Sequence, residues 1–238
     1  MKIIFTILLV MFLFSPSVIL FAQSAEYYFN KGVESLDDED YNQALIYFDL
    51  SIQKDSKLVE AYNNRGIVKD KLEDYDGSLK DFNKAIELNQ EYAEIYFNRG
   101  AIREKLSDFT GAHEDYNKAI KLDPRYLKAY LSRGGIKNEL GDYTGAIDDL
   151  SYVISSHFEL SQAYWSRAIA KEKLNDLTGA IDDVTKVINM NSEYAEAYFY
   201  RAKLYLSKGN KESACLDLKK AYEMDFEGAL ELMNTECK

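Results

Sequence analysis

Small and hydrophobic residues recur along this chain with a period of 34 residues. A tyrosine stands four residues before each small residue of the series, and a second small residue stands twelve residues after it. The first series consists of Gly32, Gly66, Gly100, Gly134, Ala168 and Ala202. Six units without insertions follow, over residues 25–58, 59–92, 93–126, 127–160, 161–194 and 195–228. Such self-similarity predicts a repeat architecture in which each unit packs on its neighbours.

Two stretches of helical periodicity lie in each unit, on either side of position 16, where the first residue of a unit is position 1. In the fourth unit, Tyr130 and Ile136 belong to the first stretch, and Ile147 and Leu150 to the second. The residue at position 16 can cap the second helix, because its side-chain oxygen accepts from free N–H groups. These residues are Asp40, Asp74, Asp108, Asp142, Asp176 and Asn210. We therefore expect two helices per unit.

Residues 229–238 depart from the repeat but keep a helical pattern. Leu230, Leu232 and Met233 follow Ala229 at helical spacing. A helix there would cover the apolar face that the last unit exposes. We expect a C-terminal capping helix over 229–238, and the two prolines in 238 residues favour an all-α chain.

These positions resemble the tetratricopeptide repeat (TPR), and the likeness covers nearly all of the chain after residue 24. The family has an aromatic residue at position 4, Gly or Ala at 8, an aromatic at 17, Ala at 20, a large residue at 24 and Ala at 27. Position 24 here reads Phe48, Phe82, Tyr116, Leu150, Val184 and Leu218. The C-terminal residues are similar to the last unit of exported bacterial repeat proteins. The resemblance implies a right-handed superhelical solenoid of six TPR helical hairpins and a capping helix.

The resemblance also implies a function, because the family binds peptides and proteins along the concave groove of its first helices. It implies a non-enzymatic scaffold or adaptor for a protein or peptide partner in the cell envelope. Two alternatives stay open: a structural subunit of a secretion, pilus or outer-membrane complex, and a glycan-binding accessory protein. An apolar patch on the convex face would favour the assembly subunit, and groove aromatics flanked by amides would favour the glycan binder.

The family's groove positions imply a set of binding residues. Position 5 carries Phe97, Leu131, Trp165 and Phe199 in consecutive units, which would form a stripe along the groove. Positions 12 and 13 would rim this stripe with both signs of charge, through Glu104, Lys105, Glu172 and Lys173. The alternative is that position 5 packs between adjacent first helices, since aromatic stripes on helices usually belong to the core.

Composition and motifs argue against several other classes of function. The formal net charge is −11 and no basic run is present, so we expect no nucleic-acid partner. Two histidines, His113 and His157, and two cysteines are too scattered for a zinc site. No glycine-rich phosphate loop follows a strand. We therefore expect no enzymatic activity, no cofactor and no metal.

Residues 1–22 have the character of a secretory signal peptide. Lys2 precedes an apolar run that Pro16 interrupts, and the small residue Ala22 stands before Gln23. We expect cleavage after Ala22 and export to the periplasm or beyond the cell. The alternative is an uncleaved N-terminal anchor with the repeats outside the cytoplasm, which would be the only expected contact with a membrane.

Charges at positions 7 and 23 vary together. Position 7 is arginine in units two to six and position 23 is aspartate in the same units, whereas the first unit has Lys31 and Tyr47. A half-buried guanidinium needs a carboxylate. Pairing each arginine with the aspartate of its own unit leaves none of these residues without a partner, whereas pairing each aspartate with the next unit's arginine leaves Arg65 and Asp217 over. We expect the structural pairs Arg65–Asp81, Arg99–Asp115, Arg133–Asp149, Arg167–Asp183 and Arg201–Asp217. The alternative is a basic stripe for an acidic ligand.

The two cysteines, Cys215 and Cys237, lie on the last repeat helix and the expected capping helix. If these helices form a hairpin that turns near residues 225–227, the two sulfurs come level near its open end. Export would place them in an oxidising compartment. We expect a disulfide between them; the alternative is two separate cysteines on apolar faces.

Overall fold

The computed structural model describes residues 24–156 and 161–238, and every regular element in these ranges is a helix. The expected signal peptide lies outside the described residues, as does the end of the fourth unit. No helix in the two ranges is long and apolar enough to cross a bilayer. The helices are α1 (Ala25–Asp37), α2 (Tyr41–Lys54), α3 (Val59–Lys71), α4 (Tyr75–Leu88), α5 (Ala93–Lys105), α6 (Phe109–Leu122), α7 (Leu127–Glu139), α8 (Tyr143–Ser155), α9 (Ser161–Lys173), α10 (Leu177–Met190), α11 (Ala195–Ser207), α12 (Lys211–Glu223) and α13 (Ala229–Glu236).

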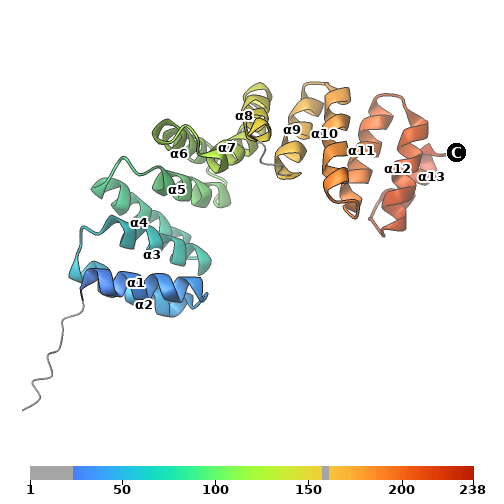
Figure 1. Cartoon of the computed structure of the whole chain (residues 1–238). Coiled ribbons are helices and arrows are strands. Elements are labelled where there is room, and N and C mark those ends of the chain that lie inside the picture. The colour runs from blue at the N-terminus through green and yellow to red at the C-terminus, as the bar shows by residue number, and fades with distance from the viewer. Residues whose placement is uncertain (1–23, 157–160) are drawn as a thin grey trace, which may run out of the picture.

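The helices pack as consecutive pairs, and each second helix also packs on the first helix of the next pair. The pairs thereby stack into a curved array, with α13 against α12 at its C-terminal end (Figure 1). We call the surface of α1, α3, α5, α7, α9 and α11 the first-helix face, and that of the even-numbered helices the second-helix face. The fold is thus an all-α solenoid of six helix pairs and a capping helix, as predicted.

Close packing within a pair depends on the small residue at position 8. A Cβ atom built on Gly32 would lie 2.6 Å from Cε1 of Phe48, and one on Gly134 would lie 2.7 Å from Cγ of Leu150. Phe48 and Leu150 are fully buried. Glycine therefore lets a large position-24 side chain lie against the backbone of the first helix.

Each second helix begins with a capped turn that explains a recurrent glycine. The position-16 side chain accepts from the N–H of position 19 in all six pairs, at 2.9–3.1 Å. A Cβ atom on Gly111 would lie 2.2 Å from Oδ2 of Asp108 and 3.0 Å from Cδ of Arg103. The same holds for Gly179, Asp176 and Lys171. Because the cap also forms on Gln43 and Ser213, glycine at position 19 chiefly leaves room for the position-11 side chain beside it, at a cost in helix propensity of about 1 kcal/mol.

Each first helix is followed by a left-handed residue at position 15. Glycine occupies this position in two turns, at Gly141 and Gly209, with φ of 80°. The other four turns carry side chains at φ of 59° to 62°: Glu39, Glu73, Ser107 and Asn175. An L-residue in this region is strained, so these four turns lower the stability of the native state.

Candidate functional site

The position-5 side chains are half-buried on the first-helix face. Trp165 shows their surroundings: its ring centroid lies 5.4 Å from that of Tyr194 and 5.1 Å from that of Tyr200. Phe97 likewise lies 5.0 Å from Tyr126. These side chains therefore support the packing of neighbouring units and also keep part of their surface exposed. They are Phe97, Leu131, Trp165 and Phe199.

The two acidic residues expected at the rim accept hydrogen bonds from tyrosines. The hydroxyl of Tyr116 donates to Glu104 and that of Tyr200 donates to Glu172, each at 2.7 Å. Burial, and then the bond to the glutamate, raises the pKa of both tyrosines well above the usual range. The hydroxyls therefore remain donors and fix the orientation of both carboxylates.

Lys105 takes part in a contact between neighbouring units. Its Nζ lies 2.5 Å from Oδ1 of Asp70 on α3 and 5.6 Å from the ring centroid of Tyr75. Asp70 is at position 12 and Tyr75 at position 17 of the second unit, whereas Lys105 is at position 13 of the third. A carboxylate and an aromatic ring of one unit thus hold the cation of the next. Lys173, at position 13 of the fifth unit, is exposed.

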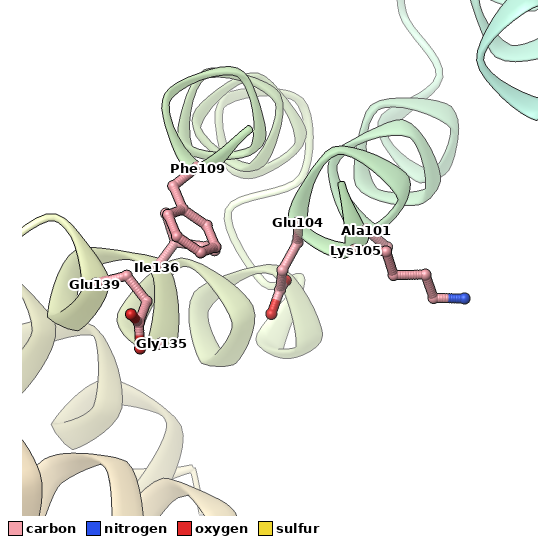
Figure 2. A pocket seen from close by; sticks show the side chains of 7 residues that line it. All are labelled: Ala101, Glu104, Lys105, Phe109, Gly135, Ile136 and Glu139. Carbon is pink, nitrogen blue, oxygen red and sulfur yellow. The ribbon is translucent and has the colours of Figure 1, made fainter. Parts of the chain in front are cut away.

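An open cleft of about 720 Å³ lies on the first-helix face between α5 and α7 (Figure 2). Its lining residues are Ala101, Glu104, Lys105, Phe109, Gly135, Ile136 and Glu139. Position 9 accounts for the space, because it is Ala101 and Gly135 here but Ile67 and Ile169 in the flanking units. A Cβ atom on Gly135 would meet nothing within 4 Å.

The structure contains the five Arg–Asp pairs within the units. In the fourth unit, Nε and Nη2 of Arg133 lie 2.7 Å and 2.6 Å from the two oxygens of Asp149, which is 5% exposed. The guanidinium carbon also lies 5.2 Å from the ring centroid of Tyr130. The same double hydrogen bond joins Arg65–Asp81, Arg99–Asp115, Arg167–Asp183 and Arg201–Asp217. Because the carboxylates are buried against them, these arginines have a structural role.

A second cation at position 11 holds the same carboxylates and was missed in the sequence analysis. Nζ of Lys137 lies 2.9 Å from Oδ2 of Asp149. Lys69, Arg103 and Lys171 make the equivalent contact in their units. The sequence does contain a pattern for this cation, because position 11 is basic in units two to five and is Tyr205 in the sixth. Two cations around one aspartate help to offset its loss of hydration.

The remaining nitrogen of each arginine connects neighbouring units. Nη1 of Arg133 donates to Oδ1 of Asn117, at position 25 of the preceding unit, over 2.6 Å. The acceptors in the other four bridges, in chain order, are Asp49 and Asn83 at 2.6 Å, Ser151 at 2.9 Å and Thr185 at 3.0 Å. Each arginine therefore stabilises its own unit and its junction with the unit before it.

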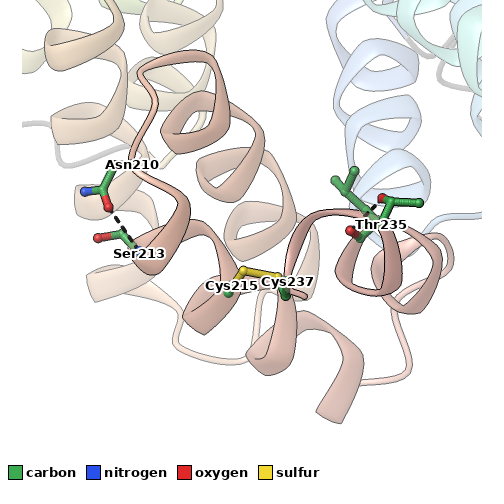
Figure 3. The surroundings of a disulfide bond; sticks show 6 residues. Asn210, Ser213, Cys215, Thr235 and Cys237 are labelled. Atoms are coloured by element: carbon green, nitrogen blue, oxygen red, sulfur yellow. Dashed lines mark hydrogen bonds between the residues drawn. A yellow bond between two sulfur atoms is a disulfide. The ribbon is translucent and has the colours of Figure 1, made fainter.

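Cys215 on α12 and Cys237 at the end of α13 form a disulfide, with Cα atoms 5.6 Å apart (Figure 3). A hollow of about 540 Å³ lies beside it, and Leu216 and Met233 contribute to its wall. Leu216 is 67% exposed on the second-helix face. The C-terminal end thus presents an apolar side chain next to a covalent link.

Outside the groove, the remaining groups of interest are possible metal ligands and the two histidines. Within the described ranges, no group of three or more His, Cys, Asp and Glu side chains could hold a metal ion. His113 is half-buried on α6, and burial, with Lys137 and Arg133 nearby, lowers its pKa below the usual value. The other histidine, His157, lies outside the described residues.

Three family models match the sequence. One is described as "TPR repeat" and matches residues 70–107. Two are described as "Tetratricopeptide repeat" and match residues 93–126 and 155–226. No curated protein gives a significant match.

Several solved structures share the fold over most of the chain. YrrB, described as a TPR protein with an unusual peptide-binding site, is 18% identical, with a TM-score of 0.71 over 79% of this chain and 97% of that one. PilW, described as a type IV pilus biogenesis factor, is 20% identical, with a TM-score of 0.73 over 87% and 96%. A tetratricopeptide repeat protein from Parabacteroides merdae is 23% identical, with a TM-score of 0.61 over 94% and 87%. At these identities the likeness concerns the fold alone.

Proposed function

The chain belongs to the tetratricopeptide-repeat family, and we propose that it is a non-enzymatic scaffold that holds a peptide or protein segment against its first-helix face. TPR proteins generally act through protein–protein contacts, which supports a role in binding. The cleft between α5 and α7 carries the proposal. It combines apolar wall and charged rim in a volume of about 720 Å³, as peptide and ligand sites commonly do.

Two further features support this surface. The half-buried rings of Phe97 and Trp165 leave apolar area along the same face. The tyrosine-held carboxylates of Glu104 and Glu172 offer oriented acceptors beside them. Rigid aromatic anchors with oriented polar groups are typical of binding surfaces.

Site-specific photo-crosslinking tests the proposal. Benzoylphenylalanine is placed at Lys105, which borders the cleft without filling it, and at Glu114, which is exposed on the second-helix face. In the cells of origin, we expect the Lys105 variant to form a defined adduct with a partner protein and the Glu114 variant to form none. Adducts only from position 114, or equal adducts from both, would contradict binding in the groove.

A second candidate function is favoured by the exposed apolar side chain at the C-terminal end. Leu216 and the hollow beside the disulfide would suit a structural subunit that contacts an envelope assembly through the second-helix face. Leu216→Glu should then release the protein from the assembly in sedimentation of the envelope fraction. A position in the gradient that does not change would count against this role.

We also propose that the protein is exported through residues 1–22. The Cys215–Cys237 disulfide supports this, since such bonds persist in oxidising compartments. Fusion of alkaline phosphatase after residue 238 should give an active enzyme in intact cells, whereas deletion of residues 2–22 should abolish the activity. N-terminal sequencing of the purified protein would decide whether cleavage follows Ala22.

A further inference from the structure

The carboxylate and the aromatic ring beside the cleft have counterparts one unit earlier, and these already hold a cation. There the position-12 carboxylate of Asp70 and the position-17 ring of Tyr75 hold the ammonium of Lys105, which comes from position 13 of the next unit. The third unit has the same two groups, Glu104 at position 12 and Phe109 at position 17. Its neighbour, however, has Glu139 at position 13 instead of a lysine.

This exchange changes the charge of the cleft. Glu104 and Glu139 are both exposed and both line it. Lys105 also borders the cleft, but its side chain extends away from the two glutamates, toward Asp70 (Figure 2). The cleft is therefore bordered by two carboxylates. At position 13, where the third unit supplies the cation Lys105, the fourth unit has the acid Glu139.

The remaining walls suit the aliphatic part of a long side chain. The half-buried Phe109 ring faces this space and supplies apolar wall, whereas Ile136, at 1% exposed, lies at its floor (Figure 2). Gly135 and Ala101 add no bulk at position 9, so a second backbone can approach this point. Lysine and arginine bury their methylene groups on such surfaces while their charged ends remain among carboxylates.

We propose that this cleft is a recognition site for a basic side chain, lysine or arginine, of the segment that binds in the groove. The partner's cation takes the place between Glu104, Glu139 and Phe109 that Lys105 takes between Asp70 and Tyr75. Tyr116 holds Glu104 in orientation through its hydroxyl. The inference rests on the proposed function, since it assigns one residue class of the bound segment.

The test uses a random dodecapeptide library selected against the whole chain, with affinities of the selected peptides measured by fluorescence anisotropy. We expect the peptides to share a basic residue, whose replacement by alanine weakens binding about tenfold. Glu139→Lys supplies an internal cation in the manner of Lys105, so it should also weaken binding about tenfold. Glu114→Lys makes the same charge change on the second-helix face and should alter affinity less than twofold.

The possible outcomes separate the two proposals. If the peptides crosslink to benzoylphenylalanine at position 105 but bind equally well to Glu139→Lys, the cation site is wrong and the groove remains the binding surface. If Glu114→Lys weakens binding as much as Glu139→Lys, the effect is one of overall charge and the site is again wrong. If the selected peptides do not crosslink at position 105, the groove itself is not the binding surface and both proposals fail.

Discussion

Asp149 offers the sharpest test of the charge arrangement inside the units. It accepts from Nε and Nη2 of Arg133 at 2.7 Å and 2.6 Å, and Nζ of Lys137 lies 2.9 Å away. Two charge-assisted hydrogen bonds at about 1.5–3 kcal/mol each would sum to roughly 3–6 kcal/mol, and the ion pair with Lys137 adds to this. Both cations keep some exposure, at 15% and 14% of their side chains, so water recovers part of this loss after the carboxylate is removed. We expect Asp149→Ala to lower the free energy of unfolding by about 3–5 kcal/mol.

The neighbouring residue provides a matched control. Asp148 is exposed on the same helix, so Asp148→Ala repeats the chemical change without the buried contacts, and we expect an effect within about 0.5 kcal/mol. Urea unfolding is followed by far-UV circular dichroism, with hydrogen exchange of α7 and α8 as a local readout because repeat arrays can unfold in parts. A difference below about 1 kcal/mol between the two variants would refute the view that these pairs stabilise the unit. Adding Arg133→Met to Asp149→Ala should recover part of the loss, since it removes one of the unpaired cations.

Three further predictions concern other features. Glu73→Gly relieves a left-handed residue and should raise the free energy of unfolding by up to about 1 kcal/mol, whereas Gly141→Ala should lower it by about 1 kcal/mol in the same urea titration. Cys215→Ser opens a link over 22 residues and should cost roughly 3 kcal/mol, with the loss of hydrogen-exchange protection confined to α12 and α13; loss spread over all units would contradict this. His113 has a lowered pKa, so the unfolded chain takes up its proton at a higher pH than the native chain does. Stability should therefore fall as the pH drops through the ordinary histidine range near 6.5, and His113→Gln should reduce that fall in thermal melts from pH 7.5 to pH 5.

The periodic features of this fold could be predicted because each is determined by its position in the repeat. Position 8 must be small where a ring such as Phe48 lies against it, and this requirement repeats in every unit. The Arg–Asp pairs could be predicted because the first unit lacks both members together. The position-11 cations also recur with the period of the repeat. A basic residue on a helix surface is usually solvated, however, so the recurrence alone did not indicate that these cations contact the position-23 aspartates.

The site itself depends on departures from the repeat, which a period does not reveal. Nothing in the spacing shows that Lys105 lies toward Asp70, because the direction of a long side chain is a choice among rotamers. The cleft likewise comes from two unlike residues at position 9, Ala101 and Gly135, whose effect depends on how closely α5 and α7 approach. The half-burial of Trp165 reflects Tyr194 and Tyr200, which come from other parts of the repeat.

The arginine bridges between units differ in acceptor and in length from the N-terminal to the C-terminal end of the solenoid. The acceptor of Nη1 is a carboxylate at Asp49 near the N-terminus and a hydroxyl at Thr185 near the C-terminus, and the bond lengthens from 2.6 Å to 3.0 Å. Ionised acceptors make stronger bonds than neutral ones, so the arginine bridges to the hydroxyls of Ser151 and Thr185 are weaker than the bridge to Asp49. Of the five bridges, those two would therefore break first under a pulling force on the two ends. The disulfide lies beyond them, where it keeps α13 attached to α12.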